Sequence, residues 1–120
     1  MGKSVRRGLF VGRFQPLHIG HVKAIKSLLR SVDELVIVVG SPQLSHEPEN
    51  PFTAGERITM IGFALNEEGI DPKKCYIIPV PDAMAHAIWA TQVITLTPSF
   101  SVIYSNEPLT RRLFKEAGFK

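Results

Sequence analysis

Short apolar runs alternate with segments of helical periodicity along this chain. Residues 8–12 (GLFVG) and 35–39 (LVIVV) are continuously apolar, and residues 76–80 and 100–104 are similar in character. A parallel strand covered on both faces has such a run, whereas a strand with one face in water alternates apolar and polar positions. The pattern therefore predicts four strands, of which the first two are expected to be covered on both faces.

Helical patterns fill the intervals between these runs. The first interval has apolar residues at helical spacing, namely Val22, Ile25, Leu28, Leu29 and Val32. The second contains Thr53 and Glu56 at the spacing of a capping box, and Gly69 suits the position that follows a helix. Between these signals lies the apolar stripe Ile58, Ile61 and Leu65. Two helices are thus predicted before the third strand.

Proline and glycine bound the last two helices. Residues 85–96 have the pattern of a helix closed by Pro98, and Pro108 suits the first turn of a fourth helix that Gly118 ends. The order βαβαβαβα predicts right-handed crossovers and a parallel sheet with helices on both faces, an α/β fold. With no linker-like stretch or internal repeat, residues 1–120 are expected to form a single domain.

Composition narrows the class of protein. The chain has 120 residues, of which 44% are hydrophobic and 21% charged, enough for one compact core. Its formal charge of +3 is a mild bias toward anionic partners and does not indicate a nucleic-acid surface. Cys75 is the only cysteine, which fits a reducing cytosol and a cytoplasmic protein. The longest aliphatic run is too short to span a bilayer, so no membrane partner is expected.

The chemically distinctive residues cluster where the predicted strands end. They occupy residues 12–21, 40–46, 81–89 and 105–108. In an open parallel sheet, ligands bind beyond the carboxyl ends of the strands, where the strand order reverses. One binding site at this edge is therefore expected.

The segment after the first strand, residues 12–21 (GRFQPLHIGH), has the strongest signal. It leads into a helix, whose first N–H groups and positive dipole end favour an anion. Arg13 adds a planar cationic donor suited to phosphate. His18 and His21 are three residues apart, which can place both rings on one side, and Gly20 lets a ligand approach the backbone. The segment predicts a phosphate site.

Two other interpretations of the histidine pair stay open at this point. A H-x-x-H pair can bind a metal ion, but the segment has no Cys, Asp or Glu to complete the ligand set. Alternatively, either histidine can be a structural helix-cap residue, His18 in particular. The segment contains neither the G-x-G-x-x-G dinucleotide fingerprint nor a Walker A loop.

The pattern G-R-F-x-P-x-H-x-G-H resembles the paired-histidine motif of the nucleotidylyltransferase superfamily. With GSPQLSH, NPFTAGER, IIPVPD and AIW, nearly the whole chain is similar to the archaeal nicotinamide-nucleotide adenylyltransferases. The resemblance implies the Rossmann-like nucleotidylyltransferase fold. It also implies an enzyme that joins ATP and nicotinamide mononucleotide (NMN) to give NAD and pyrophosphate, with Mg²⁺ carried mainly by the ATP phosphates.

The resemblance also implies roles for single residues. His21 would contact the α-phosphate, while His18 and Arg13 would hold the polyphosphate chain, and these three residues would be catalytic. Trp89 would stack on the nicotinamide ring and Asp82 would hold the ribose, although the helical spacing of Trp89 also fits a core residue. The full set expected at ATP is Gly12, Arg13, Phe14, Gln15, His18, Gly20, His21, Ser41, His46 and Arg57.

Three members of that set have a plainer interpretation as well. Ser41 and His46 can be ordinary polar residues of a surface loop. Arg57 lies in the first turn of its helix, where its charge opposes the dipole, so either a bound phosphate or a surface salt bridge to Glu56 or another acid would explain it.

The resemblance also bears on partners and on extent. It implies a homo-oligomer, with a hexamer as the expected form. The second phosphate motif of the family, Ser-x-Thr-x-x-Arg, is not found in these 120 residues, and the fifth strand and terminal helices of the family are expected to be absent from this chain. Rival functions are the same transfer to pantetheine phosphate or FMN, a CTP-dependent reaction, or nucleotide binding without turnover.

Overall fold

The structure is a computed structural model that describes residues 5–83, 85–105, 108–116 and 118. The predicted alternation of strands and helices is confirmed; residues 106–107, in the expected segment 105–108, lie outside the described part. The elements are β1 (Arg7–Gly12), α1 (Ile19–Leu28), β2 (Glu34–Gly40), α2 (Ala54–Glu67), a 3₁₀ turn (Pro72–Lys74), β3 (Cys75–Val80), α3 (His86–Leu96), β4 (Val102–Tyr104) and α4 (Pro108–Glu116).

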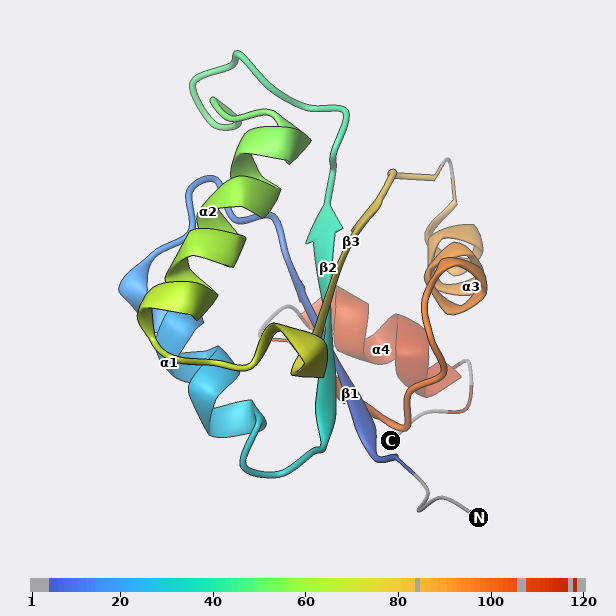
Figure 1. The fold of residues 1–120 in the computed structure, drawn as a ribbon. Coiled ribbons are helices and arrows are strands. Elements are labelled where there is room, and N and C mark those ends of the chain that lie inside the picture. The colour runs from blue at the N-terminus through green and yellow to red at the C-terminus, as the bar shows by residue number, and fades with distance from the viewer. Residues whose placement is uncertain (1–4, 84, 106–107, 117, 119–120) are drawn as a thin grey trace.

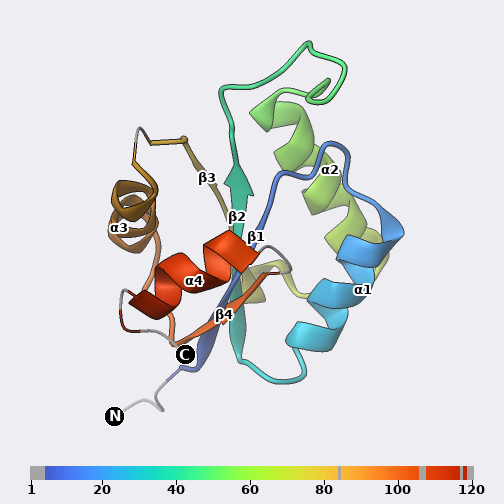
Figure 2. The same ribbon diagram turned by 180° about the vertical axis from the view of Figure 1, so that it is seen from behind.

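All four strands are parallel, in the order β3-β2-β1-β4. The chain lays down β1, β2 and β3 in one direction and then crosses back to place β4 on the other side of β1. The strand order therefore reverses between β1 and β4, which is where an open α/β sheet binds its ligands. Helices α1 and α2 cover one face of the sheet and α3 and α4 the other (Figure 1, Figure 2).

The run of residues 35–39 supplies both halves of the core. Each of these side chains in β2 is 0% exposed, as predicted for a strand covered on both faces. Leu35, Ile37 and Val39 pack with Ile25 and Ile61 of α1 and α2. Their neighbours Val36 and Val38 point the other way and pack with Val93 and Phe114 of α3 and α4. The sheet is thus fixed from both sides.

Helix α2 begins and ends where the sequence predicts. The Thr53 Oγ1 accepts the backbone N–H of Glu56 at 3.1 Å, and the Glu56 carboxylate accepts the N–H of Thr53 at 2.8 Å. Gly69 follows the helix with φ of 69°, a left-handed conformation that glycine adopts at little cost. Helix α1 is shorter than its apolar stripe, because the chain turns after Leu28, yet Val32 beyond the turn is still buried.

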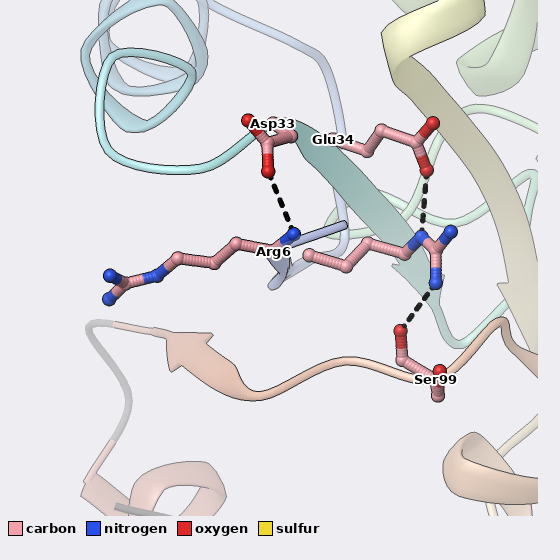
Figure 3. A network of polar contacts seen from close by, with 5 residues as sticks. Arg6, Asp33, Glu34 and Ser99 are labelled. Carbon is pink, nitrogen blue, oxygen red and sulfur yellow. Dashed lines mark hydrogen bonds and ion pairs between the residues drawn. The ribbon is translucent and has the colours of Figure 1, made fainter. Parts of the chain in front are cut away.

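Polar contacts tie the elements together at the amino-terminal edge of the sheet (Figure 3). The Arg7 Nε donates to the Glu34 carboxylate at 2.8 Å, and its Nη1 donates to the Ser99 carbonyl at 2.9 Å. The backbone N–H of Arg6 donates to Asp33 at 2.8 Å. These contacts join β1 to β2 and to the connection before β4, so this edge is occupied by the fold itself.

The fourth strand is shorter than the predicted 100–104. Phe100 turns its ring edge-on to Phe114, with centroids 6.0 Å apart, and pairing begins only at Val102. Within the described residues, none of the helices has the length and apolar character needed to cross a bilayer.

Candidate functional site

A cavity of about 480 Å³ opens at the carboxyl edge of the sheet. Its walls come from the ends of β1, β2 and β4, the segment after β3, and the facing turns of α3 and α4. The lining residues are Phe10, Val11, Gly12, Arg13, His21, Gly40, Ser41, Asp82, Ala83, Trp89, Ser105, Leu109, Thr110 and Leu113. The cavity therefore lies at the reversal of strand order, as the sequence predicts.

The two histidines of the motif form one stacked unit at the start of α1. Their ring centroids are 3.7 Å apart and their planes differ by 26°. The His18 Nδ1 accepts the backbone N–H of Gly20 at 3.1 Å, and the His21 Nδ1 accepts the N–H of His18 at 3.1 Å. His18 is thus the N-cap of α1, so its interpretation as a helix cap is confirmed. His21 lines the cavity, while His18 is exposed beside it.

These hydrogen bonds determine the chemistry of the pair. A neutral imidazole whose Nδ1 accepts a hydrogen bond carries its proton on Nε2. Both rings are therefore Nε2–H donors when neutral. Burial, and secondarily the nearby His18, lowers the pKa of His21 below its ordinary value. The arrangement presents a neutral N–H donor to the cavity at neutral pH, which suits a phosphate oxygen.

Phe14 does not line the cavity but packs against His21, which does. Its ring is 1% exposed and meets the His21 ring edge-on, with centroids 4.8 Å apart. A Cβ on Gly12 would lie 3.0 Å from the Phe14 ring, so glycine at this position allows the ring to pack closely against the end of β1. At Gly20, a Cβ would lie 3.0 Å from the His18 ring. A side chain at position 20 would therefore push the His18 ring aside by a few tenths of an ångström and disturb the stacked pair.

The opposite wall combines an aromatic ring with a carboxylate. Trp89 lines the cavity and also meets Phe114 edge-on, with ring centroids 5.8 Å apart, so the core and ligand-facing interpretations both fit. Asp82 accepts hydrogen bonds from the Ser41 hydroxyl, at 3.0 and 2.9 Å to its two oxygens, and from the Gln43 amide at 2.8 Å. These bonds hold the Asp82 carboxylate at the cavity wall.

The structure brings half of the expected residues to the cavity. Gly12, Arg13, His21, Ser41, Asp82 and Trp89 line it, whereas Phe14, Gln15, His18, Gly20, His46 and Arg57 do not. His46 is exposed in the loop after β2, where its Nδ1 lies 2.8 Å from the Ser45 hydroxyl.

Arg57 differs from both of its sequence interpretations. Its side chain is 0% exposed and donates to backbone carbonyls, so its donors are directed at the fold and not at the cavity. Among the ion pairs of the described residues, none involves Arg57, and Glu56 instead caps the helix. The phosphate contact and the salt bridge are both replaced by a structural role.

Sequence reasoning missed the wall that α4 contributes. Thr110 is 6% exposed and lines the cavity together with Leu109 and Leu113. The available signal was the topology, because a helix that follows β4 starts beside the strand-order reversal. A threonine in its first turn was a candidate on that ground.

The structure also bears on the metal interpretation of the histidine pair. Across the residues that the structure describes, no group of three or more His, Cys, Asp or Glu side chains converges as a metal-ligand set. Both Nδ1 atoms accept backbone N–H groups instead.

A parallel sheet with this strand order, and paired histidines at the start of α1, define an α/β protein of the nucleotidyltransferase type. The chain belongs to the cytidylyltransferase-like family, whose model matches residues 9–117.

Curated relatives and solved structures show more specific similarities. The chain is 54% identical to a nicotinamide-nucleotide adenylyltransferase of Saccharolobus solfataricus over 114 residues, which are 95% of this chain and 66% of that protein. It is 54% identical over 118 residues to one of Archaeoglobus fulgidus, covering 95% and 67%. A bifunctional NMN adenylyltransferase/ADP ribose pyrophosphatase of Francisella tularensis superposes with a TM-score of 0.80 at 27% identity, covering 94% of this chain and 36% of that one. The chain thus spans about two thirds of the length of the curated relatives it matches.

Proposed function

We propose that this protein transfers the adenylyl group of ATP to NMN, giving NAD and pyrophosphate. One observation carries the proposal: a single cavity is lined by Arg13 and His21, whose N–H donors suit phosphate, and by Trp89 and Asp82. Its volume of about 480 Å³ is in the range of small-molecule sites. The names of the archaeal relatives support the same reaction.

The proposed chemistry is an in-line displacement. A 5′-phosphate oxygen of NMN attacks the α-phosphorus of ATP, and the bond from that phosphorus to the bridging oxygen of the β-phosphate breaks. Pyrophosphate leaves with the bonding electrons, so no covalent enzyme intermediate is needed. The protein supplies positioning and charge stabilisation.

Each wall has its own part in this proposal. The His21 Nε2–H donates to an α-phosphate oxygen, where charge builds up in the transition state. Arg13, and His18 stacked beside His21, hold the polyphosphate chain. Trp89 stacks on the nicotinamide ring, and Asp82 accepts hydrogen bonds from the ribose hydroxyls.

We propose that Mg²⁺ enters with ATP, held by phosphate oxygens and waters. When bound, the ion would neutralise charge on the phosphates and on the departing pyrophosphate. Asp82 is a carboxylate at the cavity, but Ser41 and Gln43 already donate to it. Oxygen atoms of the phosphates and of water would therefore supply most of the ligands of the Mg²⁺ ion.

The test offers ATP or CTP with Mg²⁺ to the purified protein, together with NMN, pantetheine phosphate or FMN in separate reactions. Pyrophosphate release only with ATP and NMN is the expected result. Release only with another pair would replace the substrates and keep the reaction class. Saturable ATP binding without pyrophosphate from any pair would favour a binding module.

The oligomeric state and the location of the protein stay predictions. Light scattering in solution would test whether the protein is a homo-oligomer and whether that oligomer is a hexamer.

A further inference from the structure

Arg57 is a buried cation, and within the part of the chain that the structure describes its guanidinium binds only backbone carbonyls. It extends from the first turn of α2 toward the strand ends and is 0% exposed. Its Nε donates to the carbonyl of Thr53 at 3.2 Å, Nη1 donates to those of Arg13 and Gly40 at 3.0 and 2.9 Å, and Nη2 donates to those of Ser41 and Leu44 at 3.0 and 3.2 Å. All three nitrogens therefore have partners.

Such a group is expensive to bury. Removing a cation from water without a counter-ion is costly unless hydrogen bonds replace its hydration. Burial, and secondarily the charge of Arg13, lowers the pKa of Arg57 below its ordinary value. The fold accepts this cost where five carbonyls converge, and a planar guanidinium with five N–H groups is the one side chain that can bind them together.

The bound carbonyls flank two of the three non-glycine residues of the described chain that have a positive φ. Phe14 has φ of 54° and Ser41 has φ of 50°, left-handed values that cost energy for residues other than glycine. Arg57 binds the carbonyl of Arg13, directly before Phe14, and those of Gly40 and Ser41 around the second distorted residue. The guanidinium thus fixes the peptide groups on which both conformations depend.

Gln15 joins the same segments from the other side. Its amide Nε2 donates to the carbonyls of Leu44 and Phe52 at 3.3 and 3.1 Å, and its Oε1 accepts the N–H of Phe52 at 2.9 Å. The Leu44 carbonyl is therefore shared between Gln15 and Arg57. Together the two side chains connect the loop after β1 with residues 40–52.

We propose that Arg57 and Gln15 are positioning residues, which hold Arg13 and Ser41 in place for the reaction without touching substrate. The inference rests on the proposed function. Neither residue lines the cavity, whereas Arg13 and Ser41 both do. Ser41 in turn holds Asp82 through its hydroxyl, so Arg57 sets the cavity wall on both sides of β2.

Arg57 and Gln15 with their backbone partners are called the clamp below. Two variants weaken this clamp, and one control matches the burial of Arg57. Arg57→Lys keeps the charge but replaces the planar fork with one ammonium that cannot reach all five carbonyls. Gln15→Leu keeps similar bulk and removes both donors and the acceptor. The control is Ile61→Ala in the same helix, a 0% exposed core residue that does not line the cavity. It weakens packing and leaves the clamp intact.

The experiment measures kcat and KM for ATP and NMN, the melting temperature and hydrogen–deuterium exchange of each protein. A displacement of about 1 Å at a reacting centre can cost about 100-fold in rate. We expect Arg57→Lys to lose about that factor, mainly in kcat, and Gln15→Leu to lose less in the same direction. Ile61→Ala should melt earlier while keeping wild-type kcat at a temperature where all proteins are folded.

Hydrogen exchange separates the clamp from general destabilisation and from the proposed function. In Arg57→Lys and Gln15→Leu, faster exchange should be confined to residues 12–15 and 40–53, whereas Ile61→Ala should loosen the core around α2. This readout stands even if the wild-type protein turns over no substrate, an outcome that would overturn the proposed function alone.

Two results would overturn the positioning role. One is wild-type kcat in both clamp variants, and the other is exchange that rises uniformly along the chain as it does with lost packing. If Arg57→Lys fails to fold, Gln15→Leu decides the matter by the same two criteria.

Discussion

His18 and His21 lie face to face at the start of α1, each accepting a backbone N–H at Nδ1. One pair of side chains therefore both starts the helix and presents Nε2–H donors. This double use explains why the cap interpretation and the ligand interpretation of His18 are compatible, since the cap employs the other nitrogen.

Replacing His21 should affect the rate more than ATP binding. If its Nε2–H contacts the charge that develops at the α-phosphorus, His21→Asn should lower kcat by about 10²–10³-fold, as for the loss of one oxyanion donor. The measurement is steady-state kinetics beside ATP titration calorimetry. Lys23→Ala, at an exposed position of the same helix outside the cavity, is the control and should keep the wild-type rate. A folded His21→Asn with wild-type kcat would contradict the assignment.

The lowered pKa of His21 predicts a pH dependence of stability. Folding favours the neutral ring, because burial penalises its charged form. Below the unfolded pKa of about 6.5, the unfolded chain binds more protons than the folded one. The contribution of His21 is therefore complete above that pH and is lost as the pH falls through the lower folded value.

Urea denaturation of the wild type and of His21→Asn between pH 5 and 8 measures this contribution. The free energy of unfolding of the wild type should fall more steeply on acidification than that of the variant. Parallel curves would show that His21 titrates alike in both states.

Gly20 and Gly62 offer a matched pair of substitutions. An added Cβ at Gly20 would lie 3.0 Å from the His18 ring, while one at Gly62 in α2 meets nothing within 4 Å. Gly20→Ala should displace the His18 ring by a few tenths of an ångström and lower kcat, by less than the about 100-fold that a shift of about 1 Å can cost. Gly62→Ala should keep kcat and raise stability by about 0.5–1 kcal/mol. Equal kinetics in the two variants would show that the stacking geometry is irrelevant to turnover.

Trp89 should respond in both stability and substrate affinity. Because the ring is only partly buried, Trp89→Ala should cost less than the about 3–5 kcal/mol typical of a buried tryptophan. As a stacking platform, it should also raise KM for NMN and spare that for ATP. Phe114→Leu, which removes the edge contact from outside the cavity lining, should lower the melting temperature alone. A rise of both KM values together in Trp89→Ala would favour a core role.

Local signals in the sequence predicted most of the fold. The run of residues 35–39 has no polar position and is rich in β-branched residues, which favours a strand buried on both faces. Thr53, Glu56 and Gly69 marked the limits of α2, because capping chemistry involves neighbours in the chain. Predictions were weaker where tertiary contacts decide, as for Phe100, whose ring packs against α4 and not along the strand.

The sequence predicted the site residues at the ends of the strands, but not the residues that hold them in place or the wall formed by α4. In the sequence, Arg57 is recognisable only as a cation in the first turn of a helix. Its partners in the structure are carbonyls up to 44 residues away in the chain. The position of those carbonyls depends on the turns at Phe14 and Ser41, which no local pattern determines. Thr110 was missed because α4 reaches the cavity only once β4 pairs with β1, and that tertiary pairing has no local signal in the sequence.

The most direct measurement of the central claim follows the α-phosphorus of ATP. ATP labelled at that phosphorus with ³²P is incubated with NMN, Mg²⁺ and either the wild-type protein or His21→Asn, and the products are separated by chromatography. The account predicts label in NAD, unlabelled pyrophosphate, and a rate about 10²–10³-fold lower in the variant. Label found in ADP, AMP or inorganic phosphate, with none in NAD, would contradict adenylyl transfer to NMN.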